Sequence, residues 1–366
     1  MFIYFLLIIY ILLCPHIINY YIPNIEKQQS KILGTSLFAI FLLLALKAPS
    51  VGRDTLGYKK MYESFAYASW NNYNLYWTES GFEFLEMFFT HILKFDFQAF
   101  AATLYAFICF SYYVFLKKYS EDVMFSLLIY VCFGFIVFDL SGIRFSTSLA
   151  ISLFAFPFAQ KKGIRYFIAY FLIILLASQI HRGAYFCFFL YFVIHITTKG
   201  WQKLLYISFP AFLVVGFPLL NILLRPFSRK TFSIGIFIGG SVIFYIGVLA
   251  LIFIENLLLR SQPQYTNDMA EYISVFDNED LAIMTRLFYI GIVLVIALGE
   301  QTIVRTANYS LFFITALLPN AVKLMNNKSK FVMKTILIVF FISFFYIFKI
   351  MTNDLYMLPY IPFWQQ

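Results

Sequence analysis

The chain has 366 residues, of which 62% are apolar and 22% aromatic, while only 12% carry a charge, with a formal net charge of +9. Soluble proteins carry about 25% charged residues, and a folded surface of this size could not be solvated at half that level. The composition therefore excludes a soluble enzyme, a disordered chain and a nucleic-acid-binding domain, and it predicts a polytopic membrane protein.

The apolar runs are long and unbroken, which is typical of membrane helices. A spanning helix needs about 20 apolar residues, whereas a barrel strand alternates over about 10. A helix also satisfies every backbone N–H and C=O within its own segment, as lipid demands. We therefore predict an all-α protein, with residues 1–366 forming a single integral membrane domain of about twelve transmembrane helices. The predicted spans are 2–20, 32–50, 97–116, 124–140, 145–160, 166–181, 183–198, 202–224, 233–258, 286–303, 306–324 and 334–350.

Lysines between the spans indicate the orientation, because cytoplasmic loops carry an excess of basic residues. The best orientation places both chain ends and the long loop 51–96 outside, and the polar loop 261–285 in the cytoplasm. This polar loop is expected to be a connector; the alternative is a contact site for a partner. The basic residues that this orientation places inside are Lys27, Lys31, Lys117, Lys118, Lys161, Lys162, Arg165, Lys199, Lys203, Arg260, Arg286, Lys323, Lys328, Lys330 and Lys334.

Most arginines fall on the outer side instead, at or near helix ends. They are Arg53, Arg144, Arg182, Arg225, Arg229 and Arg305. The planar guanidinium group binds phosphate with two parallel hydrogen bonds. This distribution indicates an anionic ligand, most simply a phosphate-bearing lipid; the alternative is that these side chains only reach to lipid headgroups.

The outer loop opens with VGRDTLGYKKMY. The side chains of Arg53 and Asp54 diverge, and they could serve two groups of one ligand; alternatively, Asp54 only caps the following helix. Further on, aromatic residues could stack on sugar rings or form an interfacial belt. Residues 80–94 mix apolar residues with Glu83 and Glu86 at near-helical spacing, which predicts an amphipathic helix lying on the membrane.

Two short turns place ionisable residues close to hydrocarbon, where they are costly and often functional. In the first turn, Asp139 and Arg144 could form an ion pair that merely closes the turn. In the second, His181 precedes Arg182, and the neighbouring positive charge keeps the imidazole neutral and able to accept a proton. A structural polar contact between helices is the alternative for His181.

Six segments together resemble, in chain order, the EpsG/Wzy-like bacterial polysaccharide polymerase family. VGRDTLGY at 51–58 is similar to the family's G-x-D-x-x-x-Y motif, and ESGF at 79–82 to its E-x-G-[FY] step. A span opening with Arg144 follows, although Phe145 stands where the family often has Gln. The remaining matches are ASQIHRGAYF, VRTANYSLFFITALLP and the closing LPYIPFW.

The resemblance implies a GT-C-like membrane glycosyltransferase in the bacterial inner membrane. Such enzymes join oligosaccharide repeat units carried on undecaprenyl diphosphate at the outer face. They transfer the growing chain from its lipid diphosphate to the non-reducing end of an incoming unit. Such a reaction needs no nucleotide-sugar, metal or cofactor site, since the donor is lipid-linked. Membrane lipids and a polysaccharide chain-length regulator are the partners implied, and no nucleic acid is.

With this reaction in mind, we assign roles to the polar residues. Arg144, Arg305 and Arg53 are expected to bind the diphosphate and stabilise its developing charge. Either His181 or Asp54 is the base that takes the acceptor proton. The residues expected to contact sugar or phosphate are Tyr58, Glu79, Arg182 and Arg229.

Three rival functions remain. An O-antigen ligase uses the same donor, but its largest outer loop lies late in the chain. A flippase for lipid-linked oligosaccharide would need basic residues at mid-span depth. A membrane-bound O-acyltransferase would need a paired Asn/Asp–His arrangement.

Overall fold

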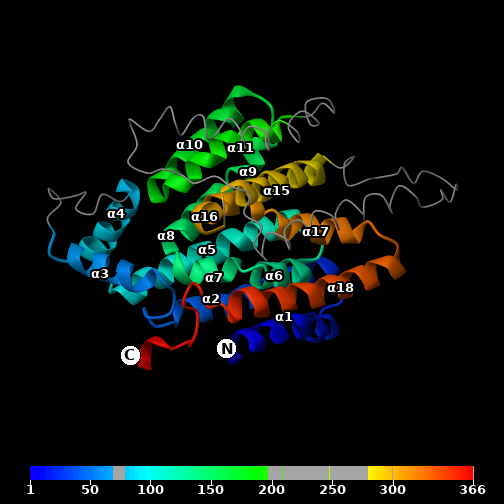
Figure 1. Ribbon diagram of the computed structural model, residues 1–366, viewed down its shortest axis with the longest axis horizontal. Helices are drawn as coiled ribbons and strands as arrows, with labels where there is room; N and C mark the ends of the chain where they lie inside the picture. The colour runs from blue at the N-terminus through cyan, green and yellow to red at the C-terminus, as the bar shows by residue number, and fades with distance from the viewer. Residues whose placement is uncertain (69–78, 197–207, 209–246, 248–278, 299, 366) are drawn as a thin grey trace. The chain divides into compact units, whose positions relative to one another are not determined.

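The computed structural model describes residues 1–68, 79–196, 208, 247, 279–298 and 300–365 (Figure 1). Within these residues the regular structure is helical, apart from one isolated β-bridge between Lys47 and Pro362. The all-α prediction is therefore confirmed for the described part. The chain divides into unit 1, residues 1–185 with 331–366, and unit 2, residues 186–330. The single membrane domain stays a prediction.

Four described helices are long and apolar enough to cross a membrane. They are α1 (Phe2–Tyr21), α2 (Ile25–Ala45), α5 (Phe97–Tyr119) and α18 (Asn327–Phe345) with its π-helical end η5 (Tyr346–Ile350). Side-chain caps explain two of the starts. The backbone N–H of Lys27 donates to Asn24 Oδ1, and that of Ala99 donates to Asp96 Oδ1. The chain is thus a membrane protein by the length and composition of these helices.

A broken pair corresponds to the predicted span 124–140. Helices α6 (Val123–Cys132) and α7 (Phe135–Ser141) meet at an angle of 57°. Gly134 makes the break, because its φ of +97° is a conformation that residues with a side chain rarely adopt. A Cβ atom there would also lie 2.7 Å from Lys349 Cε. Helix α7 therefore starts after Gly134 in a new direction, and it ends at Ser141, in the short turn before Arg144.

The next apolar segments of unit 1 form shorter helices. They are α8 (Ile143–Leu153), α9 (Phe156–Ala159), α10 (Ile164–Ile180) and the 3-10 turn η3 (Arg182–Tyr185). In the outer-loop region, α3 (Thr55–Phe65) precedes α4 (Ser80–Met87) and the π-helical turn η2 (Phe88–Leu93). Figure 1 shows α3 and α4 at the end of unit 1 where α18 runs into the C-terminal segment.

The prediction of a surface helix at 80–94 is wrong in its orientation. The segment is helical, but the side chains of Glu83 and Glu86 are fully buried, whereas Phe84 is 49% exposed. The carboxylates therefore face the interior of unit 1. The positive charge of Arg144 acts on the carboxylate of Glu86 and favours its charged form in this buried place.

Unit 2 contains α11 (Phe186–Ile194), α15 (Glu279–Leu298), α16 (Glu300–Leu311) and α17 (Ile314–Lys323). The predicted span 286–303 begins earlier, with α15, and the span 306–324 is split between α16 and α17. Close packing of α15 on α16 depends on Gly291, whose Cβ would lie 2.7 Å from Ser310 Oγ. The predicted spans 202–224 and 233–258 lie outside the described residues, and the total of twelve spans stays a prediction.

Candidate active site

The VGRDT turn has a conformation that requires glycine. Gly52 has a φ of +97°, and a Cβ atom there would lie 2.1 Å from the carbonyl oxygen of Leu140. The backbone N–H groups of Gly52 and Arg53 donate to the carbonyl oxygens of Tyr356 and Leu355, at 2.9 Å each. The turn is therefore clamped between the end of α7 and the segment 355–362, and it starts α3 at a fixed place.

Lys47 donates hydrogen bonds to this same VGRDT turn. It follows the end of α2, is 3% exposed, and its Nζ donates to Val51 O at 2.8 Å and to Thr55 Oγ1 at 2.9 Å. Thr55 Oγ1 in turn donates to Leu140 O at 3.0 Å. Burial lowers the pKa of Lys47 to about 7, because a charged ammonium group is poorly solvated there. Lys47 therefore links α2, the VGRDT turn and α7 through hydrogen bonds.

Asp54 occupies the N-cap position of α3, but its side chain makes no capping hydrogen bond. The simple capping interpretation of this residue is therefore not supported. Its backbone N–H points toward Ser141 Oγ at 3.4 Å, which brings the start of α3 close to the turn before Arg144. Arg53, beside it, has an exposed side chain.

Arg144 and Glu79 form the central ion pair of the site. Arg144 Nη1 donates to Glu79 Oε2 at 2.8 Å, and the two side chains are only 20% and 11% exposed. The guanidinium carbon also lies 5.4 Å from the centre of the Tyr58 ring and 5.8 Å from that of Phe82. Arg144 is thus held by a carboxylate and by two aromatic rings. Its distance to Glu79 Oε2 is the short one of a charge-assisted hydrogen bond.

The other carboxylate oxygen of Glu79 joins a third element. Glu79 Oε1 accepts a hydrogen bond from the backbone N–H of Arg182 at 3.0 Å. Glu79 therefore connects the start of α4 with α8 and with η3, which follows α10. The side chain of Arg182 itself is exposed at this junction.

The ESGF segment explains why α4 can approach α10 so closely. A Cβ atom on Gly81 would lie 2.6 Å from Gln179 Cβ and 2.8 Å from Gln179 O, so only glycine fits there. The neighbouring Ser80 Oγ donates to Gln179 Oε1 at 3.0 Å. Gly81 therefore lets Glu79 reach Arg144 and Arg182 together.

His181 lies between these elements, at the end of α10. Its Nδ1 accepts a hydrogen bond from the backbone N–H of Gly183 at 3.1 Å. Its ring meets the Phe145 ring edge to face, with 5.8 Å between centroids. An Nδ1 that accepts a hydrogen bond carries no proton, so the neutral ring has its proton on Nε2.

The alternative of an Asp139–Arg144 ion pair is wrong. Asp139 is fully buried and accepts hydrogen bonds from Tyr112 and Tyr130, whereas Arg144 pairs with Glu79. Asp139 therefore joins α5, α6 and α7, and it leaves Arg144 available to the outer-loop residues.

A second carboxylate beside Arg144 could not be singled out from the sequence. Glu86 is fully buried, and neither of its carboxylate oxygens has a hydrogen-bond partner. Burial raises its pKa well above the ordinary value; the charge of Arg144 opposes this shift and that of Glu83 adds to it. The one sequence feature that points to Glu83 and Glu86 is their helical spacing. That spacing is equally consistent with a helix whose acidic face is exposed to water.

Of the predicted site residues, the structure brings together Asp54, Tyr58, Glu79, Arg144, His181 and Arg182, all in unit 1. Arg53 lies next to Asp54 with its side chain exposed. Arg305 belongs to α16 of unit 2 and is half-buried. Arg229 lies outside the described residues. In the described part of the chain, no group of three or more His, Cys, Asp or Glu side chains is placed to hold a metal ion.

Comparison with known protein families gives one match, to the EpsG family, over residues 31–362. The chain belongs to the EpsG family. EpsG proteins are a Wzy-like polysaccharide polymerase family, so this chain has a polysaccharide polymerase-like role and a glycosyltransferase-like activity. The match covers the VGRDT turn and the Glu79–Arg144 pair. No curated protein and no solved structure matches the chain.

Proposed function

We propose that this EpsG protein polymerises repeat units carried on undecaprenyl diphosphate, at the outer face of the bacterial inner membrane. It transfers the growing chain to the non-reducing end of an incoming lipid-linked unit, with a GT-C-like architecture and without a metal ion. The observation that carries the proposal is the half-buried guanidinium of Arg144. Glu79, Tyr58 and Phe82 hold it beside His181 and Arg182.

The reaction has a simple balance. The acceptor hydroxyl oxygen forms a bond to the anomeric carbon of the growing chain, while the bond from that carbon to the diphosphate oxygen breaks. The diphosphate leaves with the bonding electrons, and the hydroxyl proton passes to a base. The enzyme must therefore stabilise negative charge on the leaving group and remove one proton.

Arg144 is suited to the first task because its position is already fixed before substrate binds. Preorganised donors stabilise developing charge without reorganising during the reaction. Arg182 and Arg53 present exposed guanidinium groups near the same turns and would bind the diphosphate or the sugar beside it. Arg305 and Arg229 remain proposed contributors from other parts of the chain.

For the second task the hydrogen bonds favour Asp54. Because Gly183 occupies Nδ1 of His181, the exchangeable proton of that ring sits on Nε2. His181 would then donate a hydrogen bond to a phosphate oxygen, while Asp54 takes the acceptor proton. His181 could act as the base only after it gives up the Gly183 hydrogen bond and changes its tautomer.

The test uses purified full-length protein in phosphatidylcholine nanodiscs with lipid-linked repeat units, and product length is read on gels. The wild type should build ladders unaided. Arg144→Lys keeps the charge but loses the planar guanidinium group with its two parallel N–H donors. It should lower the polymerisation rate by roughly 100-fold, the loss seen when one preorganised donor is removed. Arg165→Lys, an exposed arginine at the start of α10, is the matched control and should retain full activity.

Two further variants separate the proton-transfer roles. Asp54→Asn should abolish ladders if Asp54 is the base, whereas His181→Gln should reduce them less. The reverse order would make His181 the base. Full activity of Arg144→Lys would contradict the diphosphate role. A deletion strain adds the cellular test: it should carry single repeat units on its surface lipid, whereas loss of a ligase leaves none and loss of a flippase traps units inside. A chain-length regulator is the proposed protein partner in that setting.

A further inference from the structure

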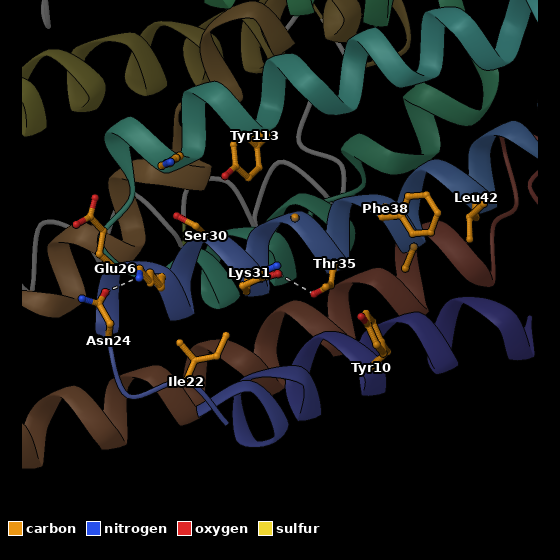
Figure 2. A pocket seen from close by; sticks show the side chains of 14 residues that line it. Tyr10, Ile22, Asn24, Glu26, Ser30, Lys31, Thr35, Phe38, Leu42 and Tyr113 are labelled. Carbon is orange, nitrogen blue, oxygen red and sulfur yellow. Dashed lines mark hydrogen bonds between the residues drawn. The ribbon is translucent and has the colours of Figure 1, made fainter. Parts of the chain in front are cut away.

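A groove outside the candidate active site runs along α2 in unit 1. It has a volume of about 1080 Å³ and is lined by side chains of α1, α2 and α5 and the α1–α2 connection. Figure 2 shows α2 running between α1, which carries Tyr10, and α5, which carries Tyr113. None of the residues proposed for catalysis lines this groove.

One end of the groove is basic. Lys27 and Lys31 are four residues apart on α2 and therefore lie on the same face, and Lys117 comes from α5. All three side chains are exposed, and Lys117 Nζ lies 5.7 Å from the centre of the Tyr113 ring. Glu26 is the one carboxylate in the lining. Within the described residues, none of the three ammonium groups pairs with a carboxylate, so they favour an anionic ligand.

The other end is apolar and lies within a candidate membrane span. Gly34 and Ala39 are small and leave space beside α2, while Phe38 and Leu42 are 60% and 37% exposed along it. From Lys31 to Leu42 the helix rises by roughly 16 Å. This length is close to the hydrocarbon depth of one membrane leaflet, about 15 Å. The groove thus has the charge and the length of a single lipid molecule.

We propose that this groove binds one anionic phospholipid. The phosphate lies among Lys27, Lys31 and Lys117, and an acyl chain lies along Gly34, Phe38 and Leu42. In the orientation expected from the lysines, this end faces the cytoplasmic leaflet, whose surface is negatively charged. The site differs from ordinary headgroup contact because three lysines from two helices meet above one apolar groove.

Native mass spectrometry of the full-length protein, titrated with phosphatidylglycerol or phosphatidylcholine, tests the site. We expect one retained phosphatidylglycerol, bound on the order of 100-fold more tightly than phosphatidylcholine, because each of the three lysines contributes about fivefold to anion binding. The combined Lys27→Gln, Lys31→Gln and Lys117→Gln variant should lose this preference. The single Lys31→Gln variant is a milder change, and its affinity for phosphatidylglycerol should fall about fivefold.

The matched control neutralises Lys118, Lys161 and Lys162, which are equally exposed and on the same predicted side but do not line the groove. It should keep the preference. Gly34→Leu leaves the charge unchanged but fills the groove, since a Cβ there meets only Tyr113 Cε2, at 3.9 Å. It should weaken phosphatidylglycerol binding.

Three results would overturn the proposal: equal retention of the two lipids by the wild type, equal loss in the groove and control variants, or unchanged binding by Gly34→Leu. Tighter binding of a polyprenyl phosphate than of phosphatidylglycerol would overturn it as well, because the occupant would then be another lipid. Thermal unfolding in phosphatidylcholine alone checks that each variant is folded. If the triple variant unfolds, Lys31→Gln and Gly34→Leu decide.

Discussion

The Glu79–Arg144 pair offers the sharpest test of how the candidate site is held together. Glu79→Gln keeps the shape of the side chain and its hydrogen bond from the Arg182 N–H, but it removes the negative charge beside Arg144. Breaking a buried pair costs about 3–5 kcal/mol. Both side chains keep some exposure, 20% and 11%, so solvent screening lowers the expected loss of folding free energy to about 2 kcal/mol.

A double-mutant cycle isolates the pair. Glu79→Gln, Arg144→Gln and the double variant would be compared by reversible unfolding in detergent, with polymer ladders as the activity readout. The coupling free energy should be about 1–2 kcal/mol, since the two groups are in direct contact. The Lys59–Glu63 pair of α3 is an exposed control, with an N–O distance of 3.7 Å, and its coupling should be about 0.5 kcal/mol or less. Strictly additive losses for Glu79 and Arg144 would refute the view that one positions the other.

Three other changes follow from the described contacts. Gly81→Ala should lower the free energy of unfolding by about 1–3 kcal/mol, because the added Cβ would overlap Gln179. The control is Gly57→Ala, which has open space around it within α3 and should be neutral or stabilising by up to about 1 kcal/mol. Equal shifts of the melting temperature in the two variants would contradict the close packing at Gly81. Lys47 binds its proton less tightly when folded, with a pKa of about 7 against 10.5. Its contribution to stability therefore rises with pH between about 7 and 10.5, by roughly 1.4 kcal/mol per pH unit. Lys47→Met should remove that part of the slope in thermal unfolding at several pH values, and an unchanged slope would show that Lys47 is not buried. Polymerisation should continue in excess EDTA, and a loss restored by Mg²⁺ would contradict the metal-independent mechanism.

Much of the fold could be predicted from hydrophobic runs and helix caps. The starts and ends of α1 and α5 agree with the predicted spans within a few residues, because long apolar segments in lipid have few alternatives to a helix. Helix α18 begins at Asn327, seven residues before the predicted span 334–350. The break at Gly134 could not be predicted in the same way. A single glycine inside an apolar run is compatible with an intact helix, and neither its φ of +97° nor its closeness to Lys349 can be read from the local sequence.

The motifs single out Arg144 and Glu79 from the sequence, but not the contact between them. Arg144 and Glu79 each belong to a recognisable motif, yet they are 65 residues apart and nothing local indicates that they pair. Asp139, five positions from Arg144, was the nearer candidate, but two tyrosines from other helices bind it instead. Glu86 was read as a surface residue because helical periodicity shows which residues share a face and not which face is covered.

The segment 355–362 braces the VGRDT turn by backbone hydrogen bonds, and Tyr360 Oη reaches Leu43 O, 317 residues away along the chain. A ribosome therefore makes the bracing segment long after the helices that it contacts have entered the bilayer. Helices can insert one at a time, but these hydrogen bonds can form only after residues 355–362 have been made. A nascent chain interrupted before residue 355 would contain every motif of the outer loop but would lack the segment that fixes the geometry of the VGRDT turn. Membrane insertion and the onset of activity would therefore be separate events.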